Sequence, residues 1–387
     1  MVTKRAKRWL TRGATLTALT AVVFFLVATW LQAGSVATDW LTASPDTSAG
    51  SAIIVSVGGG AVDLQDLGGA DVPGVWGLVF DGGRAVVGDV EPSPSGNVRR
   101  PLLEVTGVLT PGTEVWFDVA VWDLDAVERF GLDAAVTNGP EGPLVLWTAP
   151  GDNDTWVVFV HGKRGNQAEA LRLVRAVSAA GFPVAVIAYR NDEGATPSSD
   201  GHHGYGYDEW QDLQAVLDFA LGQGALDFVL VGYGSGGSIV GTLLYESRLA
   251  NRVVGVALDS PMLSLGAAIR DSWVDSGVPA WTIGWTKAIA SMRFGLDLRA
   301  LDHVERSSEW QAPVLILHGR DEGASPLDAV EAFAIARGEE ALLLTFPGAG
   351  PGASWNSDQT RYEAAVIGFL NDAAAAVSEF EPVDPER

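Results

Sequence analysis

Six near-continuous apolar runs from residue 156 onward constrain the fold of this chain most strongly. They are five or six residues long and are separated by amphipathic stretches. Strands that are apolar at every position are typical of a parallel sheet buried on both faces by helices. The pattern therefore predicts a doubly wound, mostly parallel α/β domain. The runs are residues 156–160, 184–189, 228–233, 253–258, 314–319 and 341–346.

Helical periodicity fills the segments between these runs. Residues 168–180, 210–221 and 362–377 repeat their apolar positions at helical spacing. The longest gap, residues 259–312, predicts a cap over the carboxyl edge of the sheet. Trp273, Trp281 and Trp285 lie in this gap.

A different pattern of residues precedes the α/β domain. From Ser51 to about Trp147, short apolar runs alternate with glycine and proline, and Pro111-Gly112 is the clearest turn signal. This segment predicts a small β-rich domain.

The amino terminus combines a basic cluster with a long apolar run. The first twelve residues hold five Lys or Arg and no acid, and residues 14–31 carry no charge. This run approaches the roughly 20 residues of a transmembrane helix, and the positive-inside rule places the body outside the cytoplasm. We therefore expect a single-pass protein of the cell membrane. The alternative is secretion after cleavage of a signal peptide, for which Ser35-Val36-Ala37 offers a small-x-small pattern.

These observations divide the chain into six parts. They are a basic cytoplasmic segment (1–13), a transmembrane anchor (14–32), a linker (33–50), the β-rich domain (51–150), the α/β domain (151–377) and an acidic tail (378–387).

Charge and cysteine content restrict the partners. The chain has a net charge of −23, and five positive charges lie in the first twelve residues, which leaves −28 for the rest. Such a field repels nucleic acid, so we expect a small-molecule ligand or a neutral or cationic partner, with the membrane contacted through the anchor. The chain has no cysteine, which excludes disulfides, thiolate metal sites and a cysteine nucleophile. Nothing in the sequence indicates a metal or another cofactor.

Several motifs, taken in order, resemble those of the bacterial α/β-hydrolases. The resemblance covers most of residues 70–370 and implies an α/β-hydrolase fold with a serine on a sharp strand-to-helix turn, followed in the chain by a carboxylate and a histidine. The motifs are VVFVHGKRG, VIAYRNDEGATPSSDG, EWQDLQAVLDFAL, VLVGYGSGGSIV, VLILHGRDEGASP and SWNSDQTRYEAAVIGFL.

Steric crowding selects the residue at the tip of that turn. Residues two before and two after the tip must be small, because strand and helix pass close together. With Ser235 at the tip, one of them would be Tyr233; with Gly234 at the tip, they are Gly232 and Gly236. The nucleophile position is therefore predicted to be Gly234, which has no side-chain oxygen.

The other two positions of the expected triad also depart from the family pattern. All five histidines lie at or before residue 318, and the resemblance places the histidine position at Pro351. It places the acid at Glu322, beside Asp321. The resemblance further implies an oxyanion hole formed by backbone N–H groups at Gly162, Lys163 and Ser235. The resemblance therefore implies the fold of a serine esterase or peptidase whose nucleophile and base positions are replaced. We expect a degenerate serine hydrolase, non-catalytic or weakly active, that binds a small ligand or a partner.

Two alternatives to a degenerate hydrolase remain open. One is an active ester or amide hydrolase that uses Ser235 with a recruited base, and His202 and His203 in the loop 192–206 are the candidates. The other is dinucleotide binding, because Gly232, Gly234 and Gly237 form G-x-G-x-x-G and Asp259 follows at the end of the next strand.

Overall fold

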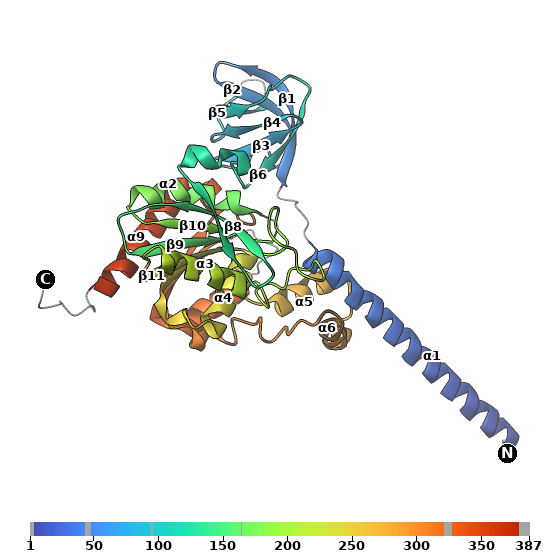
Figure 1. Ribbon diagram of the computed structural model, residues 1–387. Helices are drawn as coiled ribbons and strands as arrows, with labels where there is room; N and C mark the ends of the chain where they lie inside the picture. The colour runs from blue at the N-terminus through green and yellow to red at the C-terminus, as the bar shows by residue number, and fades with distance from the viewer. Residues whose placement is uncertain (1–3, 43–47, 94–95, 164, 321–326, 379–387) are drawn as a thin grey trace, which may run out of the picture.

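The computed structural model describes residues 4–42, 48–93, 96–163, 165–320 and 327–378. A long N-terminal helix leads into a small barrel, and the barrel lies against a larger domain in which helices cover both faces of a sheet (Figure 1). The acidic tail beyond Ser378 lies outside the described residues.

The N-terminal helix is longer than predicted. Helix α1 spans Lys4–Val36 and continues as a π-helical turn, η1, over Ala37–Leu41. From Ala14 to Leu41 it is long and apolar enough to cross a bilayer, by length and composition. The predicted linker 33–50 is therefore wrong in its first part. Ala33, Val36 and Leu41 are buried in a cluster with residues of the predicted cap. The small and polar residues around them indicated a linker, but these three apolar contacts hold the segment against the body.

Six antiparallel strands form the closed barrel, in the order β1-β2-β5-β4-β3-β6. Alternating residues such as Ile54, Leu64 and Phe117 fill its interior. Arg100 is also fully buried there, and its guanidinium donates hydrogen bonds to backbone carbonyls. The strands are β1 Ser48–Gly58, β2 Ala61–Gly68, β3 Trp76–Phe80, β4 Gly83–Val87, β5 Val98–Thr106 and β6 Glu114–Asp118.

The large sheet has eight strands in the order β14-β13-β12-β11-β9-β10-β8-β7. Strand β9 pairs in parallel with β10 on one side and with β11 on the other, and β11 to β14 each pair in parallel with the next strand. Strand β8 is antiparallel to both β10 and β7. The strands are β7 Asp133–Asn138, β8 Pro143–Ala149, β9 Thr155–Val160, β10 Val184–Ile187, β11 Asp227–Tyr233, β12 Val253–Asp259, β13 Val314–Gly319 and β14 Ala341–Phe346.

The sheet includes two strands that the sequence assigned to the β-rich domain. Strands β7 and β8 precede residue 150, but β8 pairs with β10 and β7 pairs with β8, so the α/β domain begins near residue 133. Both form a hairpin with a partly exposed edge, and this local pattern resembles that of the barrel strands. Pairing with a strand 40 residues away decides the sheet to which they belong.

Helices cover both faces of the sheet (Figure 1), and successive residues of its central strands are buried on opposite faces. In β9, Val157 and Phe159 face α2 and α9, whereas Val158 and Val160 face α3 and α4. The helices are α2 Leu171–Ala179, α3 Trp210–Gly222, α4 Ser235–Glu246, α5 Leu265–Asp275, α6 Ala280–Phe294, α7 Leu327–Arg337, α8 Ser354–Ser357 and α9 Gln359–Ser378. Shorter 3-10 turns are η2 Leu124–Phe130, η3 Gln167–Ala170, η4 Ala250–Arg252, η5 Ser307–Glu309 and η6 Gly338–Glu340.

The barrel is joined to the sheet through the SWN motif. The Asn356 side-chain amide donates hydrogen bonds to the backbone carbonyls of Val75 and Val119. The backbone carbonyl of Asn356 accepts a hydrogen bond from the Val75 N–H. A Cβ on Gly74 would lie 1.7 Å from the Asn356 carbonyl oxygen, so only glycine permits this close approach. Asn356 thus joins the barrel to α8, the short helix that comes after β14 in the chain.

Candidate functional site

The turn between β11 and α4 has Gly234 at its tip. Gly234 has φ 49° and ψ −116°, a conformation that is strained for residues with a side chain. Its N–H donates to the Asp259 carbonyl and its own carbonyl accepts from the Met262 N–H, each at 2.9 Å. The turn is thus held in place by the segment that follows β12.

Close packing leaves no room for side chains on either side of the tip. A Cβ on Gly232 would lie 2.8 Å from the Gly237 backbone, and one on Gly236 would lie 2.2 Å from the Val160 carbonyl oxygen. At Gly234, by contrast, the nearest atom to an added Cβ is 3.9 Å away. The strand-to-helix crossing therefore needs glycine at 232 and 236, whereas Gly234 faces open space.

Ser235 begins α4 beside this tip. Its side chain is buried, and its hydroxyl oxygen accepts a hydrogen bond of 2.6 Å from the Lys163 N–H. The Gly162 N–H is also engaged, because it donates to a Glu169 carboxylate oxygen at 3.0 Å. The two predicted anion-binding amides after β9 thus already have acceptors within the protein. The Ser235 N–H belongs to the first helical turn, where N–H groups have no intrahelical acceptor.

The carboxylate that accepts from the Gly162 N–H belongs to a buried ion pair between Glu169 and Arg172. Arg172 donates to the Glu169 carboxylate at 3.1 Å and to the Gly352 carbonyl at 2.7 Å. Burial raises the pKa of Glu169, against the opposing effects of Arg172 and the Gly162 amide. The pair therefore fixes the end of β9 to the loop after β14. Pro351, the predicted histidine position, is an exposed residue of that loop.

Asp259, the acidic residue of the dinucleotide pattern, is engaged within the protein. It is 1% exposed, and its two carboxylate oxygens accept from the hydroxyls of Ser260 and Tyr362, each at 2.9 Å. The glycine pattern also follows β11, which is the fifth strand of this sheet in sequence order, whereas a dinucleotide fingerprint normally follows the first. This geometry does not favour a ribose contact at Asp259.

Hydrogen bonds of Arg190 and Asn191 hold the carboxyl end of β10 in place. Arg190 makes a bidentate ion pair with the buried Asp212. Asn191 accepts from the Ser198 N–H and donates to the His202 carbonyl. Together these bonds fix the start of the loop 192–206.

His161 pairs with Asp192 at the same edge of the sheet. Its Nε2 lies 2.8 Å from an Asp192 oxygen, and its ring stacks on Tyr189 at 4.4 Å. Burial alone would lower the pKa of His161, but the charge and hydrogen bond of Asp192 outweigh it and raise the pKa. The ring nitrogens are both engaged, since Nδ1 lies 2.9 Å from the Gly162 carbonyl oxygen.

The two candidate replacement bases lie in the loop 192–206, but neither is hydrogen-bonded to Ser235 in the described part of the chain. His202 is partly exposed and pairs with Asp200 at 3.3 Å. His203 is buried, its Nδ1 has no hydrogen-bond partner among the described residues, and burial lowers its pKa to about 4. A base that is neutral at pH 7 therefore exists at His203, without a described contact to a nucleophile.

Asp321 and Glu322, the predicted acid positions, lie outside the described residues. Within the part of the chain that the structure describes, no cluster of three or more His, Asp or Glu side chains is placed to bind a metal ion.

A buried serine–histidine pair was missed by the sequence reasoning. The Ser238 hydroxyl and His303 Nε2 are 2.7 Å apart, and Tyr245 contacts the other ring nitrogen. Ser238 is 1% exposed and His303 is fully buried, and burial lowers the pKa of His303 to about 3. Because no substrate can reach this pair, we interpret it as part of the packing between α4 and the cap. No local sequence pattern links Ser238 to His303, which lies 65 positions further along the chain.

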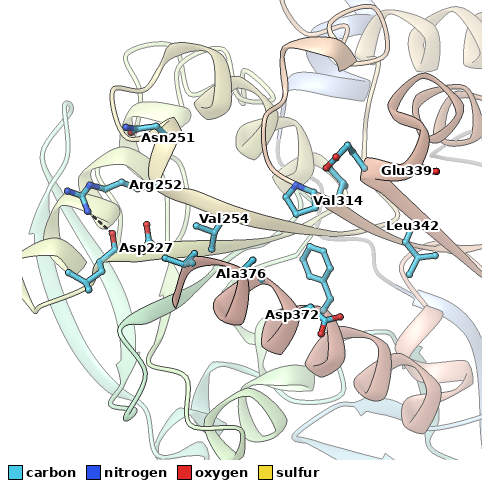
Figure 2. A pocket seen from close by; sticks show the side chains of 15 residues that line it. Asp227, Asn251, Arg252, Val254, Val314, Glu339, Leu342, Asp372 and Ala376 are labelled. Atoms are coloured by element: carbon cyan, nitrogen blue, oxygen red, sulfur yellow. Dashed lines mark hydrogen bonds between the residues drawn. The ribbon is translucent and has the colours of Figure 1, made fainter. Parts of the chain in front are cut away.

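Two prominent cavities lie among the described residues, and the larger of the two is far from the Gly234 turn. It has a volume of about 980 Å³ at the amino ends of β11 to β14 and is lined by Asp227, Val254, Val314 and Leu342 (Figure 2). The Gly234 turn is at the carboxyl ends of the same parallel strands. The smaller cavity, about 230 Å³, is lined by residues of the loop 192–206 and the end of α6, including His202 and His203. Neither Gly234 nor Pro351 lines either of these two cavities.

Comparisons with known proteins concern the two domains separately. A family model described as a domain of unknown function, DUF8805, matches residues 53–118, which form the barrel. No curated protein matches the chain in sequence. An esterase from Pyrococcus furiosus, Pf2001, is similar in structure, with a TM-score of 0.51 and 15% identity over 65% of this chain and 94% of the esterase. The α/β domain has the α/β-hydrolase fold.

A second solved structure supports this assignment. A putative lipase from Acinetobacter baumannii has a TM-score of 0.50 and 12% identity, over 65% of this chain and 95% of the lipase. The α/β-hydrolase fold accounts for the strand order and for the sharp turn after β11. At these identities the likeness concerns the fold, so the chemistry must be argued from the residues.

Proposed function

We propose that this chain is a membrane-anchored α/β-hydrolase-fold protein that binds a small ligand or a partner and has lost serine-hydrolase turnover. The observation that carries the proposal is the turn after β11. Its tip is Gly234, in a conformation of φ 49° and ψ −116°, so the position that would hold a nucleophile has no side-chain oxygen. Removal of a triad member leaves only residual catalysis in the serine-protease template.

The state of the neighbouring groups supports the same proposal. The hydroxyl of Ser235 accepts the Lys163 N–H, and this amide would otherwise be open to an oxyanion. Pro351, where the resemblance implies the histidine, cannot accept a proton. A serine nucleophile needs a base within about 3 Å, and no described histidine nitrogen is hydrogen-bonded to Ser235. The scaffold is thus retained without the arrangement that activates a serine.

The smaller cavity is the proposed ligand site. Its lining combines Arg190, Glu209 and His203 with the apolar side chains of Leu41 and Phe294. Its volume of about 230 Å³ is below the roughly 300 to 1,000 Å³ of sites for drug-sized ligands, so its ligand would be small. The acidic surface favours a neutral or cationic molecule.

Anchoring by α1, with the amino end in the cytoplasm, is part of this proposal. The contacts of Ala33 and Val36 with the cap support an uncleaved anchor, because cleavage after Ala37 would remove both from a buried cluster. The basic residues before Ala14 support the orientation.

A serine-directed fluorophosphonate tests the proposal on the full-length protein in detergent. We expect no covalent adduct by intact-mass spectrometry in wild type or in Ser235→Ala. An adduct on the wild type that disappears in Ser235→Ala would overturn it. The double variant Gly234→Ser, Pro351→His serves as the matched comparison, because it supplies both missing side chains on an otherwise identical scaffold.

A further inference from the structure

The cap helix α6 exposes an apolar face. A surface helix normally buries its apolar side and exposes its polar side. In α6 the side chains of Trp281, Trp285 and Met292 are 72%, 65% and 75% exposed. They recur at spacings of four and seven residues, so they form one stripe along the helix. The residues between them on this face, Gly284 and Ala288, are also exposed and uncharged.

This stripe is continuous with the apolar helix α1. The ring of Trp281 stacks on that of Phe25, with the centroids 5.4 Å apart and the planes 15° from parallel. Figure 1 shows α6 beside the end of α1 that enters the body. An exposed tryptophan of the cap therefore lies against a residue of the candidate membrane span.

The other end of α6 meets α1 close to the end of its apolar run. Arg293 donates to the Trp30 carbonyl at 3.0 Å, and its guanidinium lies 4.6 Å above the Trp30 ring. Tryptophan and arginine at the end of an apolar helix are typical of a membrane–water boundary. The other cation of α6, Lys287, turns toward the body and donates to the Gly266 carbonyl. The exposed stripe thus has no charge.

The length of α1 gives the depth of the contact. The apolar run ends at Leu31, and Phe25 lies six residues before it, which corresponds to about 9 Å along a helix. Helices that lie in a membrane interface bury their apolar face by about 5 to 10 Å. The depth of Trp281 thus matches that of an interfacial helix.

We propose that the face of α6 formed by Trp281, Trp285 and Met292 is a second membrane contact, inserted into the leaflet of the bilayer nearer to the body. The occupant of this face is lipid, because the face continues the lipid-facing surface of α1 and contains no charged group. This inference rests on the proposed anchoring by α1. It adds that the cap, and with it the end of the smaller cavity at Phe294, is held at the membrane surface.

The absence of cysteine allows a direct test by single-site spin labelling. A nitroxide is attached at Ala288→Cys on the exposed face of α6, in the full-length protein reconstituted in vesicles of phosphatidylcholine and phosphatidylglycerol. Phe24→Cys, at a 75% exposed position of α1, reports on the anchor. Ile335→Cys, at an 80% exposed position of α7, is the control for solvent. Each label is probed with oxygen, which concentrates in lipid, and with a water-soluble nickel chelate.

We expect the label at 288 to resemble the label at 24, with greater access to oxygen than to nickel, and the label at 335 to show the reverse. Nickel access at 288 with oxygen access at 24 would overturn the second contact while leaving the anchor intact. Nickel access at both positions would overturn the anchor itself. Spin–spin broadening at 288 that disappears on dilution with unlabelled protein would show that a second copy of the chain covers the face, which also overturns the proposal.

Discussion

The backbone N–H of Lys163 donates a 2.6 Å hydrogen bond to the side-chain oxygen of Ser235, next to the turn at Gly234. The amide comes from the loop after β9 and the hydroxyl from the first residue of α4, 72 positions further along the chain. The single serine oxygen at this turn is thus used as an acceptor for a structural amide. An oxyanion hole would require the Lys163 N–H to be free of an acceptor, whereas here it is bonded to Ser235.

Ser235→Ala should destabilise the protein because it leaves the buried Lys163 N–H without this acceptor. An unsatisfied buried donor costs about 1 to 3 kcal/mol, and we expect the free energy of unfolding to fall by this amount. Urea unfolding in detergent, followed by tryptophan fluorescence, measures it. Ser272→Ala, at an exposed position of α5, is the control and should change stability by less than about 0.5 kcal/mol. Equal stability of the two variants would contradict the structural role.

Alanine substitutions along the turn should follow the available space. Gly236→Ala forces a Cβ to within 2.2 Å of the Val160 carbonyl oxygen, and overpacking of this kind costs about 3 kcal/mol or more. Gly234→Ala has open space and should cost only the strain of its backbone conformation, about 1 to 3 kcal/mol. Urea midpoints of the two variants give the order. A larger loss at Gly234 than at Gly236 would contradict the register of the turn.

The sequence predicted the α/β sheet because most of its strands are near-continuous apolar runs, from Thr155–Val160 to Ala341–Phe346. It did not predict which sheet takes β7 and β8, because a partly exposed hairpin has the same local pattern in either domain. Nor did it predict that Asn356 binds the barrel, since its partners Val75 and Val119 are more than 200 residues away. Long-range contacts of this kind leave no local periodicity.

At the candidate site, local sterics were the informative signal. The size restriction at Gly232 and Gly236 could be predicted from the residues alone. The bond from Lys163 to Ser235 could not, because it depends on how two loops meet. The same limit applies to α6, whose tryptophans indicated a cap but not a contact with α1.

The barrel should depend strongly on Arg100 and weakly on its neighbour. Arg100 is fully buried, donates to the carbonyls of Ala70, Gly74 and Gly88, and has its pKa lowered to about 10 by burial. Arg100→Met leaves these carbonyls unsatisfied and should cost at least about 3 kcal/mol. Arg99→Met removes partly exposed ion pairs with Asp63 and Glu91 and should cost about 1 kcal/mol. Similar losses in both variants, measured by thermal unfolding, would contradict the account.

Acid should destabilise the folded chain through His203. Burial lowers its pKa to about 4 from the usual 6.5, so between these values the unfolded chain binds a proton that the folded chain does not. The free energy of unfolding therefore falls as the pH falls from 6.5 toward 4. His161 has a raised pKa and acts in the opposite direction, with stability that is lost as the pH rises.

A comparison of variants isolates the contribution of His203. His203→Phe, unfolded in urea at pH 7 and at pH 4.5, should lose less stability on acidification than the wild type. An unchanged pH dependence would show that His203 is not buried in its neutral form.

Turnover of short acyl esters by the full-length protein tests the central claim most directly. Because the tip of the turn has no side-chain oxygen and Ser235 accepts a hydrogen bond from Lys163, we predict equal hydrolysis by wild type and Ser235→Ala, at the rate of the protein-free buffer. Hydrolysis by the wild type that is lost in Ser235→Ala, with a pH dependence near 6.5, would contradict it.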